Sequence, residues 1–140
     1  MQIQRFEKFY YPIIIKEHHL DTFGHVNNAT YLQLFEEARW EFISTRGFDL
    51  KGIEKSGLGP TILECHIKFL REIRLREKII IESETQTYEG KVGFLLQVMK
   101  NEKEELCCEA KFTFGLFDVK ARKLVQPTPE WFYAVGALAQ

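Results

Sequence analysis

The sequence contains no long apolar run: its apolar stretches are short and interrupted by polar residues. A membrane-spanning helix needs about 20 consecutive apolar residues, so neither a membrane span nor a membrane partner is expected. The first residues, Met1 to Lys8, are mixed and polar, without the apolar centre of a targeting signal. The net charge is −1, which provides no general attraction for nucleic acid, so no nucleic-acid partner is expected.

Cysteine is also scarce. Cys65, Cys107 and Cys108 are odd in number and include an adjacent pair. No paired disulfide framework follows from this spacing, and reduced thiols in a cytoplasmic protein are the simplest interpretation. All three fall at expected strand positions, where buried, unreactive thiols are typical.

Several catalytic motifs are missing as well. His18, His19, Asp21 and His25 lie close together, but no His-Glu-x-x-His or Cys-x-x-Cys motif accompanies them, so no metal is predicted. Without Gly-x-Ser-x-Gly, a serine-hydrolase elbow is not expected. There is no glycine-rich phosphate loop either.

The 140 residues suit one domain covering residues 1–140, and 12 phenylalanines predict a large aromatic core. Residues 9–16 are rich in β-forming side chains and predict a first strand, in which Pro12 favours an edge position. Residues 18–28 predict a loop. The apolar residues then change to a helical period, and the stripe consists of Tyr31, Leu34, Phe35, Ala38, Phe42 and Ile43.

Asn27 or Asn28 is suited to cap the start of this helix, and Gly47 to end it. Residues 48–60 predict a turn-containing connection. Four sets of strand residues with period-2 apolar character follow: Leu63, Cys65, Ile67 and Phe69; Ile79 and Ile81, running on to Tyr88; Val92, Phe94, Leu96 and Val98; and Leu106, Cys108, Ala110, Phe112, Phe114 and Leu116. Thr128-Pro129 opens a short last helix expected to reach Leu138.

One helix with a wide apolar stripe and one antiparallel sheet with an apolar face bury both surfaces by packing together. The predicted fold class is therefore α+β, with the sheet wrapped around one long central helix.

The loop before that helix carries the most specific motif. Asp21-x-x-Gly24-His25-Val26-Asn27-Asn28-x-x-Tyr31, followed by Phe-Glu-Glu-Ala-Arg at 35–39, resembles the 4-hydroxybenzoyl-CoA thioesterase-like branch of the hotdog superfamily. The His-Val-Asn-Asn segment is also similar to plant acyl-ACP thioesterases. The resemblance extends over nearly the whole chain and implies a hotdog acyl-CoA thioesterase. It implies no cofactor, since coenzyme A enters only as part of the substrate.

The resemblance also implies roles for these residues. Asp21 is expected to attack the thioester directly or to deprotonate a water. The backbone N–H of Asn28, at the helix start, is the expected oxyanion site. His25 matches the plant-type spacing and is the third catalytic candidate, because Asn28 stands where one subgroup of the family has a histidine or tyrosine.

Gly24, Asn27 and Tyr31 are the candidate substrate-binding residues, with Gly24 allowing close approach of the backbone. Each motif residue also has a purely structural interpretation. A loop aspartate is commonly a turn residue, an asparagine before a helix a cap, and Tyr31 a core residue.

Three alternatives stay open. The same fold with acyl carrier protein as the substrate requires a basic patch beside the pocket. A non-catalytic acyl-CoA binding module would normally carry an effector domain, and a dehydratase uses a different pair of residues. The basic run of Arg71, Arg74, Arg76 and Lys78 suits either coenzyme A phosphates or a charged strand edge. The family further implies a homodimer or a homotetramer.

Overall fold

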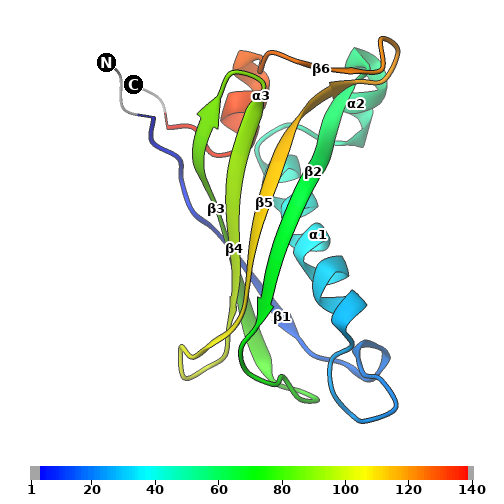
Figure 1. Ribbon diagram of the computed structural model, residues 1–140, viewed down its shortest axis with the longest axis vertical. Coiled ribbons are helices and arrows are strands. Elements are labelled where there is room, and N and C mark those ends of the chain that lie inside the picture. Colours follow the sequence, from blue (N-terminus) through cyan, green and yellow to red (C-terminus); the bar gives the residue numbers. More distant parts are fainter. Residues whose placement is uncertain (1–3, 139–140) are drawn as a thin grey trace.

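A computed structural model describes residues 4–138 of the chain. Six strands form one antiparallel sheet in the order β1-β3-β4-β5-β2, with β6 paired to β5. The strands are β1 (Phe9–Ile14), β2 (Leu58–Phe69), β3 (Lys78–Glu89), β4 (Val92–Lys100), β5 (Leu106–Asp118) and β6 (Lys123–Val125). The helices are α1 (Asn28–Thr45), α2 (Leu50–Ser56), α3 (Pro129–Ala134) and a short 3₁₀ helix, η1 (Glu17–His19). The sheet curves around α1, so the predicted hotdog architecture is confirmed (Figure 1).

The apolar stripe of α1 forms one side of the core. All six stripe residues predicted from the helical period are buried. All of them except Phe42 belong to one core cluster with buried side chains of the sheet, among them Ile79, Ile81, Met99 and Phe112. Burying each large aliphatic or aromatic side chain contributes roughly 1.5–3 kcal/mol, so this contact fixes the helix against the sheet.

The predicted inner face of β5 is confirmed, except that Leu106 at its start is exposed. The prediction for β4 is wrong: Leu95, Gln97 and Met99 are buried, whereas Phe94 lies on the outer face and is 38% exposed. Apolar residues occupy both faces of this strand, so alternation alone does not identify the inner one. Pairing of Leu95 with Phe112 sets the actual register.

Strand β2 is an edge of the sheet, and its predicted apolar face is only partly confirmed. A bulge between Ile62 and Glu64 displaces Leu63 from the regular alternation. Cys65 pairs with inward-facing Phe112, but it is exposed, contrary to the expectation of a buried thiol. The cause is the position of α1, which contacts β1 and β3 more than β2.

Two other segments differ from prediction in smaller ways. Residues 48–60 hold the helix α2 as well as the first residues of β2. Helix α3 ends at Ala134 rather than near Leu138, because Gly136 takes a left-handed φ of 103° that helices do not continue through. The edge position of β1 is confirmed. Within residues 4–138, no helix has the length and apolarity to cross a membrane.

Candidate functional site

The motif residues form a tight loop that leads into α1. A β-bridge between Leu20 and Val26 closes the loop, and the backbone N–H of Asp21 donates to the carbonyl of His25 at 2.8 Å. Gly24 sits inside with φ of 80°, a conformation that favours glycine. A Cβ at this position would meet no atom within 4 Å, so backbone conformation, rather than space, requires glycine here.

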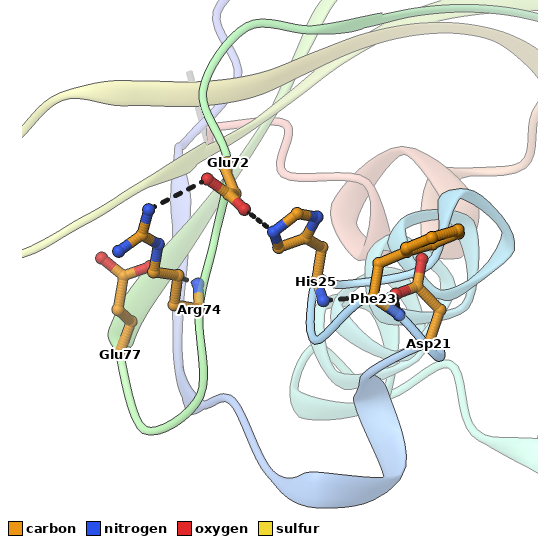
Figure 2. Close-up of polar contacts among 6 residues, drawn as sticks. All are labelled: Asp21, Phe23, His25, Glu72, Arg74 and Glu77. Atoms are coloured by element: carbon orange, nitrogen blue, oxygen red, sulfur yellow. Dashed lines mark hydrogen bonds and ion pairs between the residues drawn. The ribbon is translucent and has the colours of Figure 1, made fainter.

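The carboxylate of Asp21 organises this loop. One oxygen, Oδ1, accepts hydrogen bonds from the backbone N–H of Phe23 at 2.9 Å and of His25 at 3.2 Å (Figure 2). The other oxygen has no hydrogen-bond partner among residues 4–138. Asp21 is therefore a turn residue and, at the same time, a half-buried carboxylate with one free oxygen.

The cap at the start of α1 takes up only some of its backbone N–H groups. The side chain of Asn27 accepts from the N–H of Ala29 at 2.9 Å, which confirms Asn27 as the cap. Its carbonyl accepts from Thr30 and Tyr31. The N–H of Asn28 is left without an acceptor within the described part of the chain, at the positive end of the helix dipole.

His25 has a partner that the sequence did not reveal. Its Nε2 contacts Oε1 of Glu72, which lies in the connection between β2 and β3 (Figure 2). The other oxygen of Glu72 accepts from Nη2 of Arg74 at 3.3 Å. Glu72 lies 47 positions beyond His25 inside a charged stretch, and nothing in its local sequence distinguishes it from its neighbours.

The three arginines of the basic run lie in the same connection, whereas Lys78 is the first residue of β3. Arg74, Lys78 and Lys103 contribute to a polar cleft of about 500 Å³, whose walls also carry acidic side chains, Glu72 among them. Three arginines of the run are paired with carboxylates: Arg71 with Glu105, Arg74 with Glu72 and Arg76 with Glu17.

Two aromatic side chains lie beside the loop, and one is exposed while the other is buried. Phe23 is 82% exposed and lies beside Asp21 (Figure 2). Tyr31 is buried and packs edge-on against Phe69 with ring centroids 5.1 Å apart. Burial raises the pKa of Tyr31 to about 12, so its phenol stays neutral at physiological pH. Tyr31 is thus part of the core next to the site.

Comparison with known proteins gives consistent results. The profile of the thioesterase-like superfamily matches residues 16–135. Long-chain acyl-CoA thioesterase FadM of Escherichia coli (strain K12) is 32% identical over 112 residues, which cover 79% of this chain and 84% of FadM. Acyl-acyl carrier protein thioesterase ATL3 of Arabidopsis thaliana is 29% identical over 115 residues, covering 81% of this chain and 60% of ATL3.

Solved structures share the fold. The probable thioesterase YbaW from Escherichia coli superposes with a TM-score of 0.77 at 29% identity, covering 89% of this chain and 94% of YbaW. The protein SAV2348 from Staphylococcus aureus, solved in complex with CoA, gives 0.85 at 16% identity, covering 100% of this chain and 92% of that one.

Proposed function

Since this chain belongs to the thioesterase-like superfamily and is a thioester hydrolase, we propose that it hydrolyses an acyl-CoA to a carboxylic acid and free coenzyme A. The observation that carries this proposal is the loop from Asp21 to Asn28. It holds a carboxylate with one free oxygen immediately before a helix start with a free N–H.

In the proposed reaction the thioester carbonyl points at the N–H of Asn28. Charge that develops on this oxygen is stabilised by the N–H and the helix dipole, worth several kcal/mol in comparable oxyanion sites. The free oxygen of Asp21 attacks the carbonyl carbon to give a mixed anhydride, which a water then hydrolyses to release the acid, or it removes a proton from a water that attacks the carbonyl directly. The C–S bond then breaks and the thiolate of coenzyme A takes up a proton.

His25 is the proposed proton carrier. When neutral imidazole donates through Nε2 to Glu72, Nδ1 remains an acceptor that can take the proton released by the attacking water, directly or by way of Asp21, and pass it to the leaving sulfur. Glu72 is then a positioning residue, because it fixes which nitrogen carries the proton. Gly24, Asn27 and Tyr31 remain proposed substrate contacts beside these groups.

The charge pattern favours coenzyme A over acyl carrier protein. An acidic carrier would need a basic surface beside the site. In the described part of the chain, the arginines nearest His25 already have carboxylate partners, and acidic side chains line the adjoining cleft. Lys78 and Lys103, for which no ion pair is found within residues 4–138, are the proposed contacts for phosphate groups of coenzyme A.

We further propose that the protein works as a homodimer formed through β2. This strand leaves one edge of the sheet open, and unpaired strand edges readily bind another strand (Figure 1). Exposed apolar side chains gather on and beside it: Leu32, Trp40, Ile62, Leu63, Phe69 and Leu70. A second copy would cover them across a two-fold axis, and two such dimers would make a homotetramer.

Thiol release from a panel of short, long and aromatic acyl-CoAs tests the proposed reaction. Asp21→Asn keeps a side-chain oxygen that can accept the loop hydrogen bonds but removes the charge. We expect kcat to fall by at least ~10²-fold. Asp49→Asn is the matched control, since Asp49 also accepts a backbone hydrogen bond, at 2.9 Å from Gly52, but caps α2.

Activity that falls in Asp21→Asn and persists in Asp49→Asn would support the assignment. Equal activity in both variants would contradict a catalytic Asp21. If the folded wild type released thiol from none of the panel, the acyl-CoA substrate would be wrong, and acyl carrier protein thioesters would be tested next.

A further inference from the structure

A second site lies at the opposite end of α1 from the Asp21 loop. A cavity of about 240 Å³ is lined by residues of α1, the start of β2 and α3. These three elements meet near the top of Figure 1. Its walls are mainly apolar and include both tryptophans of the chain, Trp40 and Trp131. One water needs roughly 10–15 Å³ of such space, so the cavity is large enough for part of an organic ligand.

Arg39 brings a cation into this apolar space. Its guanidinium lies over the ring of Phe112, 4.5 Å from the centroid, and Nη1 donates to Oε1 of Gln97 at 3.0 Å. Burial lowers the pKa of Arg39. Among residues 4–138 no carboxylate lies within ion-pair distance of it, and its other nitrogens have no acceptor. Arg39 is one of the residues that line the cavity.

The neighbours of Arg39 hold it in this position. Gln97 is fully buried, and its Nε2 donates to the carbonyl of Phe35 at 3.0 Å and to Oγ of Ser83 at 2.9 Å. With its amide nitrogen committed to these two acceptors, Gln97 presents its oxygen to Arg39. The side-chain amide of Gln97 therefore has hydrogen-bond partners for both its nitrogen and its oxygen. In this network only the guanidinium of Arg39, which lines the cavity, keeps N–H groups without an acceptor among the described residues.

We propose that this cavity receives the distal part of the acyl group and that Arg39 selects acyl groups carrying a neutral oxygen acceptor there, such as a hydroxyl or keto group. Arg39 is half-buried, and a plain alkyl chain would cover the rest of its guanidinium without pairing it, which is unfavourable for a donor removed from water. Glu36 also lines the cavity, and its negative charge offsets the attraction of Arg39 for a carboxylate, so a neutral acceptor is favoured there.

This inference rests on the proposed function, because the acyl group must reach the cavity from the Asn28 end. Arg39 lies about three helical turns beyond Asn28, roughly 16 Å along the axis. A chain of roughly a dozen carbon atoms spans that distance, which defines the ligands for the test.

Binding of non-hydrolysable thioethers tests the inference without turnover. The probes are S-dodecyl-CoA and its ω-hydroxy and ω-carboxy counterparts. The reporter is the tryptophan fluorescence of a Trp40→Phe background, in which Trp131, 1% exposed and in the cavity wall, is the remaining tryptophan. We expect the ω-hydroxy ligand to bind at least ~10-fold more tightly than the dodecyl ligand, and the ω-carboxy ligand to gain less.

Variants test whether Arg39 causes the preference for the ω-hydroxy ligand. Arg39→Met should bring the dodecyl and ω-hydroxy affinities within about 2-fold of each other, and Arg39→Lys, which keeps a cation and donors, should retain part of the difference. Arg122→Met is the matched control, because Arg122 also lies over an aromatic ring, that of Phe117, but is exposed and outside the cavity. Circular dichroism confirms that each variant is folded.

Equal affinities in the Trp40→Phe background, or a preference that survives Arg39→Met, would overturn the inference. The inference would also fail if calorimetry showed that the thioethers bind while Trp131 emission stayed unchanged. In that case the ligand would not enter the cavity, and a second copy or another element would fill it. Preferential binding without hydrolysis of any acyl-CoA would leave the inference standing and refute the proposed function. Hydrolysis of acyl-CoAs with no preference would do the reverse.

Discussion

At the scale of single residues, the site depends on side chains that do two things at once. Asp21 holds its own loop with one carboxylate oxygen and leaves the other free, so its structural and catalytic interpretations do not compete. His25 donates its backbone N–H to Asp21 and pairs its imidazole with Glu72. The two loops that supply Asp21 and Glu72 are therefore connected through one residue.

Glu72→Gln tests this connection. The variant can still hydrogen-bond to His25 but loses the charge that favours one proton position on the ring. We expect kcat to fall by ~10-fold or more, with a changed pH profile of kcat and little change in KM. Steady-state kinetics across the pH range in which histidine titrates would measure this.

Glu17→Gln is the matched control, since Glu17 is an exposed carboxylate that pairs with Arg76 in a neighbouring segment. An unchanged pH profile in Glu72→Gln, or an equal loss in Glu17→Gln, would remove Glu72 from the mechanism.

At the scale of elements, the start of α1 carries the proposed oxyanion site, and its geometry depends on the Asn27 cap. That cap takes up the N–H of Ala29 and leaves the N–H of Asn28 free. Asn27 could serve only as a cap, or it could also touch the substrate. The two roles separate when the cap is replaced by another residue type that caps equally well.

Asn27→Ala should lower the free energy of unfolding by about 1 kcal/mol, because one helix N–H loses its acceptor. Asn27→Ser should restore that stability, since serine is a comparable cap. Urea unfolding and kcat/KM measured on both variants distinguish the roles. If serine restores stability and activity together, Asn27 is only a cap; if activity stays low, the asparagine contacts the substrate.

At the scale of the whole molecule, the open β2 edge is the main unexplained surface of the monomer. Edge strands with exposed apolar side chains are rare in stable monomers, because they bind other strands. Cys65 lies on the same strand and is exposed, whereas Cys107 and Cys108 are buried. Burial raises the pKa of Cys108 to about 12, so this thiol should resist alkylation in any assembly.

Ile62→Lys should convert the proposed dimer to a monomer, as measured by light scattering after gel filtration. A lysine on a pairing edge opposes strand addition. Ile80→Lys is the matched control: Ile80 is 44% exposed, close to the 40% of Ile62, but lies on β3 away from the edge. A monomeric wild type, or a dimer that survives Ile62→Lys, would refute the β2 interface. Alkylation of Cys65 should be faster in the monomeric variant.

The sequence by itself determined the features that follow from local periodicity and from the motif. The stripe of α1, strands β1 to β5, a cap at Asn27 or Asn28 and the loop containing Asp21 are predictable, because helix and strand periods and capping chemistry act over a few residues. Only the tertiary structure decided which face of β4 is buried, because Leu95 and Phe94 are both apolar and pairing with β5 selects between them. It alone brought Glu72 to His25 and Gln97 to Arg39, since these contacts join segments that are distant in the chain and carry no local signal.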